Sequence, residues 1–157
     1  RFWECIIAGT YPGHGECYLH PEDILWWSKG GVLHGESPQR IAFLRDVLES
    51  SPAEGIEPID KWQYANIAGK AGEYYLVYFG SERPKSWRFF LPRHELADGM
   101  RFRIEILDTW DMTITPVEWE ADVRAESEYV FVDKEDREVE LPGKPWMALR
   151  ITRVEGE

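Results

Sequence analysis

The sequence predicts a mainly β protein in which a short α-containing N-terminal part is followed by an antiparallel β-sandwich. Before about residue 50, apolar residues recur at the spacing of a helix. After about residue 60, short β-rich runs separated by turn residues follow one another at intervals of roughly 8–15 residues, which is typical of a sandwich. We therefore expect two parts, residues 1–52 and an all-β domain over residues 60–157.

The helical signals lie in the N-terminal part. Ser37 suits the N-cap and Pro38 the first helical position, so the sequence predicts a helix over residues 38–50. The apolar stripe of this helix is Ile41, Leu44, Val47 and Leu48. The opening residues RFWECIIAG predict the later turns of another helix. The polar connector SSPAEGIEP then marks the boundary between the two parts.

The strand signals begin with EYYLVYFG, which is dense in β-forming residues and ends at a glycine. The run MRFRIEILD alternates, with Phe102, Ile104 and Ile106 on one face and Arg103 and Glu105 on the other. The predicted strands lie within residues 73–80, 87–91, 100–108, 110–119, 128–133 and 145–154.

Composition limits the classes of partner. The formal net charge is −11, and no cluster of Lys and Arg interrupts it, so we expect neither nucleic acid nor an anionic membrane as a partner. No apolar run approaches the roughly 18 residues of a membrane span. The chain has eight Trp, seven Tyr and seven Phe. Most of these should build the core, but flat aromatic faces also bind sugars, which keeps carbohydrate among the candidate ligands.

Cys5 and Cys17 provide no disulfide framework, and we expect free thiols, which favours a reducing, cytoplasmic location. The chain lacks an initiator methionine and opens within a helix. We therefore expect it to be the C-terminal piece of a longer protein, and secretion of that protein stays open.

The stretch GHGECYLH, residues 13–20, is a dense cluster of reactive side chains. His14, Glu16, Cys17 and His20 are all potential zinc ligands, but their spacing matches no recurring zinc motif. In a strand, Glu16 and Cys17 would point to opposite faces. The H-x-E pattern also occurs in zinc deaminases, whose second cysteine motif is absent here. Because no phosphate-binding loop pattern occurs either, we expect no metal and no cofactor.

Three longer stretches resemble a known family. GTYPGHGECYLHPEDILWWSKGGVLHGESPQRIAFLR resembles the last strand, loop and helix of an apiosidase-like (β/α)8-barrel glycoside hydrolase. EYYLVYFG, together with LDTWDMTITPVE and LPGKPWMALRI, is similar to the β-sandwich domain that follows such barrels in bacterial carbohydrate hydrolases. The resemblance implies that residues near 10–14 form the last barrel strand and that the helix at 38–50 closes the barrel.

The same resemblance implies a site and a function. Active sites of these barrels lie on the loops after the strands, so GHGECYLH would border a sugar cleft. The implied substrate-binding residues are His14, Glu16, Tyr18, His20, Trp26, Trp27, His34 and Glu36. The two catalytic carboxyl groups that a glycosidase needs would lie upstream of Arg1, and Glu16 is only a weak catalytic candidate. The parent protein would then be a glycosidase whose upstream barrel is the partner of this chain, and the chain alone would be inactive.

Several residues keep a structural alternative. Glu16 and the three histidines near it can instead anchor loop backbone, and Glu36 can favour the helix N-terminus. For Trp110, Trp119 and Trp146 we expect core or interface positions. The acidic stretch DKED, residues 133–136, predicts a solvated hairpin tip.

Two other functions remain open, a stand-alone carbohydrate-binding β-sandwich and a purely structural or assembly domain. The first predicts that the chain alone binds sugar through an exposed tryptophan, whereas the glycosidase-fragment hypothesis predicts no such affinity. The fragment hypothesis also predicts an unusually apolar surface on the first 50 residues.

Overall fold

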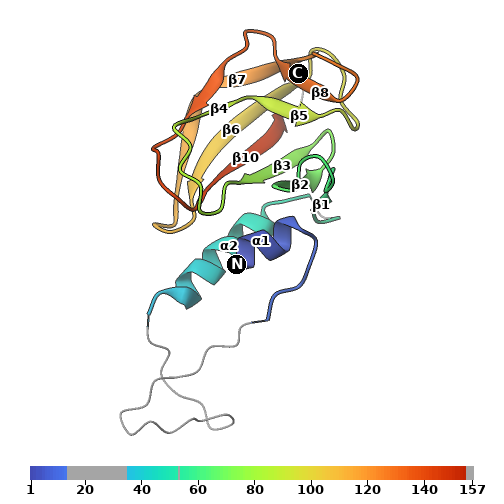
Figure 1. The fold of residues 1–157 in the computed structure, drawn as a ribbon. Coiled ribbons are helices and arrows are strands. Elements are labelled where there is room, and N and C mark those ends of the chain that lie inside the picture. The colour runs from blue at the N-terminus through green and yellow to red at the C-terminus, as the bar shows by residue number, and fades with distance from the viewer. Residues whose placement is uncertain (14–34, 53, 155–157) are drawn as a thin grey trace, which may run out of the picture.

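The computed structural model describes residues 1–13, 35–52 and 54–154 (Figure 1). The helices are α1 (Phe2–Ile7) and α2 (Ser37–Glu49). The strands are β1 (Glu57–Pro58), β2 (Ile67–Lys70), β3 (Tyr74–Tyr78), β4 (Ser86–Arg88), β5 (Phe90–Pro92), β6 (Arg101–Asp108), β7 (Thr113–Ala125), β8 (Val130–Asp133), β9 (Glu138–Glu140) and β10 (Met147–Val154).

Antiparallel pairing joins eight strands into one sheet in the order β1-β2-β3-β10-β6-β7-β8-β5, and β4 pairs with β9 in a separate ribbon. Strand β7 makes the large sheet continuous, because most of its length pairs with β6 and its end pairs with β8. A register shift between Arg103 and Glu105 interrupts the β6–β7 ladder, as a bulge does where a strand bends. The mainly β, antiparallel prediction is confirmed, but the strands form one curled sheet and a small ribbon instead of the two separate sheets of the expected sandwich.

The larger apolar core lies inside the curled sheet. Its fully buried members include Tyr75, Val77, Phe89, Leu91, Phe102, Ile104, Val123, Leu149 and Ile151. The alternation predicted for residues 100–108 is confirmed up to Ile104, since Phe102 and Ile104 are buried in this core while Arg103 is exposed. From Glu105 on it is lost, because Glu105 is largely buried beside Arg150 and Ile106 is only half-buried. Burying one such side chain stabilises the fold by about 1.5–3 kcal/mol.

Strand β3, with the sequence YYLVY, is buried on both faces. Tyr75 and Val77 belong to the core inside the sheet, whereas Tyr74, Leu76 and Tyr78 belong to a second core beneath the helices. Because successive side chains of a strand point to opposite faces, five consecutive buried residues require cover on both sides. Helices α1 and α2 supply the second cover, lying side by side against one face of the sheet (Figure 1).

The helices contribute few but large side chains to the second core. Trp3, Ile7, Leu44 and Val47 are all buried there, and the Trp3 ring stacks on Tyr78 with 5.6 Å between ring centroids. Helix α1 is six residues long, well short of the length at which an isolated helix is stable in water. The N-terminal part is therefore held in its helical form by the sheet.

Some element boundaries differ from the prediction. The helix expected over residues 38–50 is observed one residue earlier, because Glu36 occupies the N-cap position that was assigned to Ser37. The run at residues 87–91 divides into β4 and β5, which belong to different sheets. Strands β1, β2 and β9 were not predicted, because they are only two to four residues long and carry too little alternation to be recognised.

No part of a (β/α)8 barrel is visible in the described ranges, and residues 10–13, expected to begin the last barrel strand, are irregular. In these ranges, the large apolar side chains that the first 50 residues expose are the fully exposed Tyr11 and half-buried ones such as Phe2, Ile6 and Phe43. Within the part of the chain that the structure describes, no helix is long and apolar enough to cross a membrane.

Gly69 allows the close approach of β2 to β3. A Cβ atom at this position would lie 2.0 Å from the carbonyl oxygen of Tyr74, which is backbone and cannot turn away. We expect Gly69→Ala to lower the free energy of unfolding by about 2 kcal/mol or more, because the strand pair must separate to admit the methyl group. Gly13→Ala is the matched control, since its Cβ would meet no atom within 4 Å. Equal urea midpoints for the two variants would contradict the prediction.

Candidate functional site

A pocket of about 470 Å³ opens where the first turns of α2 meet the turn after β6. Its lining is rich in aromatic rings, contributed by Phe2, Trp3, Tyr78, Trp110 and Trp146. Among the described residues that line it there is no carboxylate. The pocket therefore offers apolar and aromatic contacts, and its described walls lack the pair of carboxyl groups that glycoside hydrolysis requires.

The turn after β6 is organised by the buried carboxylate of Asp108. Its Oδ1 accepts hydrogen bonds from the N–H groups of Trp110 and Asp111 at 3.0 and 2.9 Å, and its Oδ2 accepts one from Lys144 Nζ at 3.3 Å. Burial favours the neutral acid, but these donors together outweigh it and hold the pKa of Asp108 below its usual range. The ionised carboxylate thus fixes the backbone that carries Trp110.

Trp146 also lines the pocket and has a strained backbone conformation, with φ at +65°. Three hydrogen bonds hold it. Its carbonyl oxygen accepts from both the N–H and the Oγ1 of Thr109, and its N–H donates to the carbonyl of Gly80 at 2.7 Å. The rings of Trp110 and Trp146 stack at 6.4 Å between centroids. The phrases LDTWDMTITPVE and LPGKPWMALRI, separated in the sequence, therefore meet at this pocket.

Arg40 attaches the first half of α2 to the same turn. Its guanidinium lies 3.6 Å from the centroid of the Trp110 ring, and its Nε donates to the Trp110 carbonyl at 3.0 Å. Glu36 accepts a hydrogen bond from Arg40 at 2.6 Å and makes no side-chain hydrogen bond that caps the helix. Glu36 thus pairs with the guanidinium that lies over the indole, while its place at the N-cap of α2 fits the predicted structural role at the helix N-terminus. Its predicted contact with a substrate stays a prediction.

The other end of α2 is fastened to the sheet by polar contacts. Tyr74 donates a hydrogen bond to the Val47 carbonyl at 3.3 Å, and Arg150 donates one to Ser50 Oγ at 2.9 Å. Arg150 also pairs with Glu105 at 2.6 Å, and both side chains are largely buried. Burial raises the pKa of Tyr74, so its hydroxyl remains a donor at neutral pH. Helix α2 is therefore held to the sheet at both ends.

The structure separates the predicted site residues into two groups. His14, Glu16, Tyr18, His20, Trp26, Trp27 and His34 lie outside the described residues. Glu36 is described and lies beside the aromatic pocket.

The three tryptophans of the β-domain occupy the predicted core or interface positions in different ways. Trp119 packs against the larger core inside the sheet, and Trp146 packs against the second core beneath the helices. Trp110 is 52% exposed and lies at the contact with α2.

Sequence reasoning missed Arg40, Asp108 and Lys144. Arg40 contacts a turn 70 residues away, so local spacing contains no trace of that partner. The DTWD stretch did contain a usable signal, because an aspartate at the start of a turn commonly accepts hydrogen bonds from the next backbone N–H groups. Among the described residues no group of three His, Cys, Asp or Glu side chains is placed to hold a metal ion.

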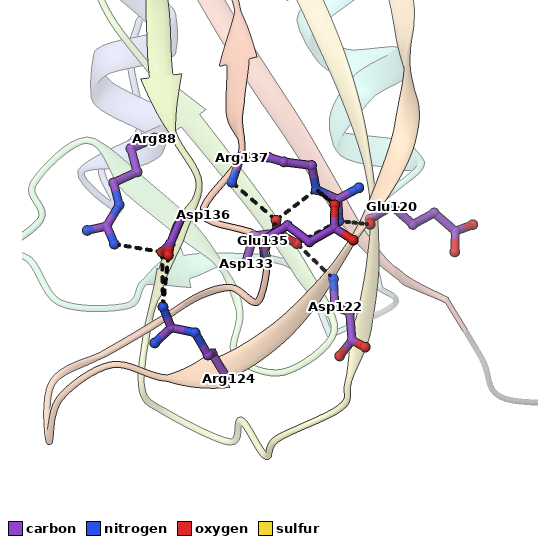
Figure 2. A network of polar contacts seen from close by, with 8 residues as sticks. All are labelled: Arg88, Glu120, Asp122, Arg124, Asp133, Glu135, Asp136 and Arg137. Atoms are coloured by element: carbon purple, nitrogen blue, oxygen red, sulfur yellow. Dashed lines mark hydrogen bonds and ion pairs between the residues drawn. The ribbon is translucent and has the colours of Figure 1, made fainter.

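The DKED stretch differs from the predicted solvated tip, because Asp133 is fully buried. Its oxygens accept two hydrogen bonds of 2.8 Å from the Arg137 guanidinium and one of 3.2 Å from each of the N–H groups of Asp122, Glu135 and Arg137 (Figure 2). Burial alone would raise its pKa, but Arg137 and the backbone donors lower it below the usual range. Asp133 therefore holds the β7–β8–β9 region together, and the exposed Glu135 and Asp136 keep the predicted character.

The fold and this arrangement define a mainly β, antiparallel domain with two helices fixed across one face of its sheet. Residues 62–152 match the family described as "Domain of unknown function (DUF5605)", and the chain belongs to this family. No curated protein matches the chain.

A crystal structure described as that of a putative glycoside hydrolase from Bacteroides vulgatus ATCC 8482 is similar over nearly the whole chain. The sequence identity is 35% and the TM-score is 0.84. The match covers 94% of this chain and 30% of that one, so this chain spans less than a third of the length of its solved relative. The chain thus carries a domain related to glycoside hydrolases.

The contact between Arg40 and Trp110 should contribute to the attachment of α2. We expect Arg40→Gln to lower the free energy of unfolding by about 1–2 kcal/mol, because it removes a cation–π contact and a hydrogen bond to backbone at a largely buried side chain. Arg45→Gln is the matched control on the same helix, since Arg45 is 68% exposed and, within the described residues, pairs with the exposed Asp46 and Glu49. A larger loss for the Arg45 variant in urea denaturation would contradict the assignment.

Asp133→Asn tests the buried acid. The new NH₂ group must face N–H donors, so we expect the free energy of unfolding at pH 7 to fall by about 3 kcal/mol. Glu135→Gln, at a side chain that is 72% exposed, should change it by less than about 0.5 kcal/mol.

The pH dependence of this variant follows from the lowered pKa of Asp133. An acid whose pKa is lower in the folded state stabilises that state above its unfolded pKa, about 4, and loses this contribution as the pH falls through the folded pKa. The difference in stability between the unmodified chain and Asp133→Asn should therefore be constant from pH 6 to 8 and shrink below about pH 4. A difference that grows on acidification would exclude this role for Asp133.

Proposed function

We propose that the chain is the C-terminal segment of a bacterial glycoside hydrolase. In this proposal residues 1–52 are the end of an apiosidase-like catalytic barrel, and residues 60–157 form an accessory β-domain that supports it. The similarity to a glycoside hydrolase over 94% of the chain supports the class of enzyme. The substrate contacts expected at Glu36 and within residues 14–34 belong to this proposal.

The observation that carries the proposal is the attachment of α2 at both ends. The helix is held by Arg40 on Trp110 at one end and by Tyr74 and Arg150 at the other, and Leu44 and Val47 are buried between these contacts. A domain joined through such contacts moves with its neighbour as one body, because apolar burial and several hydrogen bonds must be lost together before they separate. This is the property that a supporting domain needs.

Catalysis by this chain alone is not part of the proposal. Hydrolysis of a glycosidic bond needs two carboxyl groups on opposite sides of the bond, about 5–9.5 Å apart. The described residues that line the aromatic pocket include no carboxylate, and the carboxylates Asp108 and Asp133 are each occupied by several donors. We therefore place the catalytic pair in the upstream part of the parent protein.

The test compares the intact parent protein with the present chain on a panel of aryl glycosides and oligosaccharides. The intact protein should hydrolyse at least one substrate, and the chain of residues 1–157 should hydrolyse none. In the intact protein, Arg150→Gln should lower the temperature at which activity is lost, because it breaks the ion pair with Glu105 and the contact with Ser50. Arg153→Gln, at an exposed position three residues further along the same strand, is the control. Hydrolysis by the chain alone would refute the assignment.

A further inference from the structure

Two aromatic side chains far apart in the sequence stand almost free in solvent beside the same surface hollow. Trp62 is 90% exposed and Tyr11 is fully exposed, whereas most large aromatic side chains of the described chain are buried or half-buried. Both line a hollow of about 840 Å³ next to the edge strand β1. Exposing an indole to water in this way forgoes the stabilisation that burial would give, so the position calls for a role outside the fold.

Trp62 is presented by a fixed turn. The turn begins at Asp60, whose Oδ1 accepts a hydrogen bond from the N–H of Gln63 at 3.1 Å and whose carbonyl accepts one from the N–H of Tyr64 at 2.7 Å. Ile59 before the turn and Tyr64 after it both pack against the larger core inside the sheet. The anchors on both sides hold Trp62 at the tip of the turn. Because the backbone of this turn is already ordered, ligand binding has to order only the side chain of Trp62, which has two rotatable bonds.

Tyr11 reaches the hollow because the chain turns back at the end of α1. Gly9 ends the helix with φ at +71°, and a Cβ at this glycine would lie 3.0 Å from the Pro58 ring. This close approach places the segment after α1 against β1, within the same hollow as Trp62. The two aromatic residues are thus brought together by contacts of the fold.

Beside Ile56, Pro58 and Ile59, the hollow is lined by polar side chains, most of them acidic. Glu57, Asp60, Lys61 and His94 line the hollow, and the Lys61 Nζ lies 5.4 Å from the centroid of the Trp62 ring. A further lining carboxylate, Glu54, is engaged by Lys70 at 2.9 Å. Carboxylate oxygens accept hydrogen bonds from hydroxyl groups, and ammonium and imidazole N–H groups donate hydrogen bonds to hydroxyl oxygens. Flat aromatic faces surrounded by such groups suit a pyranose ring, which has apolar C–H faces and a rim of hydroxyls.

We propose that the hollow formed by Tyr11, Trp62 and the polar residues around them is a glycan-binding site, in which Trp62 stacks on a pyranose ring of an uncharged polysaccharide. The choice of a carbohydrate rests on the proposed function, whereas the site itself rests on the exposure and geometry of the two aromatic residues. The acidic wall and the net charge of −11 oppose polymers of uronic acids. The site changes the expectation that this chain alone has no affinity for sugar.

The experiment is affinity electrophoresis of the chain of residues 1–157 in gels containing xyloglucan, arabinoxylan, galactomannan or polygalacturonate. At least one of the three neutral polymers should retard the chain, and polygalacturonate should not. We expect Trp62→Ala to weaken the retarding interaction about tenfold and Tyr11→Ala to weaken it less. Tyr129→Ala, which removes an aromatic side chain that is 57% exposed and does not line this hollow, is the matched control and should bind as the unmodified chain does.

Each other outcome has a definite meaning. Because Trp62 belongs to neither core, the melting temperature of Trp62→Ala should equal that of the unmodified chain, and a lower one would show that the exposed indole stabilises the fold instead. If no polymer retards the chain, or if Trp62→Ala is retarded as strongly as before, the inference is wrong. Capture of polygalacturonate instead of neutral polymers would overturn the stated ligand class.

This test is separable from that of the proposed function. If the intact parent hydrolyses glycosides while the chain binds no neutral polymer, the glycan site is refuted and the proposed function stands. If the chain binds a neutral polymer through Trp62 while the intact parent hydrolyses nothing, the glycan site stands and the proposed function is refuted.

Discussion

The burial of β3 on both faces is the constraint on which the rest of the structure depends. Tyr75 and Val77 are buried inside the curled sheet, so the sheet must close over them. Tyr74, Leu76 and Tyr78 are buried on the other face, where the two helices cover them together with Ile56 and Trp146. If this face of the sheet were exposed to solvent, three large side chains, two of them tyrosines, would be exposed as well. The short helices are therefore part of the same folding unit as the strands.

Polar contacts between helix α2 and the sheet fix the position of the helix more closely than apolar packing alone would. At one end of α2, Arg40 lies over Trp110, whose turn is fixed by ionised Asp108. At the other end, Arg150 connects Glu105 to Ser50. Partly buried ion pairs such as these contribute modestly to stability, but they define one relative position of helix and sheet. A supporting domain in a larger enzyme depends on that single position.

The polar groups of the β-domain divide into those that hold the fold and those that remain available. Asp108 and Asp133 accept hydrogen bonds at both of their oxygens, and their lowered pKa values follow from those donors. Neither is free to transfer a proton at neutral pH. At the hollow beside β1, in contrast, Trp62 and Tyr11 make few contacts and face solvent. The proposed glycan site therefore lies at the edge of the sheet, whereas the turns and the two cores stabilise the fold.

The sequence by itself determined the elements with strong periodicity. The stripe of Leu44 and Val47 predicted α2 within one residue at each end, and the alternation of Phe102 and Ile104 predicted the buried face of β6. The tertiary structure decided what depends on partners distant in the chain: the continuity of the sheet through β7, the burial of Asp133, and the contact of Arg40 with Trp110 across 70 residues. Periodicity reports which face of an element is apolar, whereas the partner of a charged or aromatic side chain is chosen by the fold. For the same reason the candidate residues of GHGECYLH were drawn from local composition, while the paired exposure of Tyr11 and Trp62 became visible only when the fold brought them to one hollow.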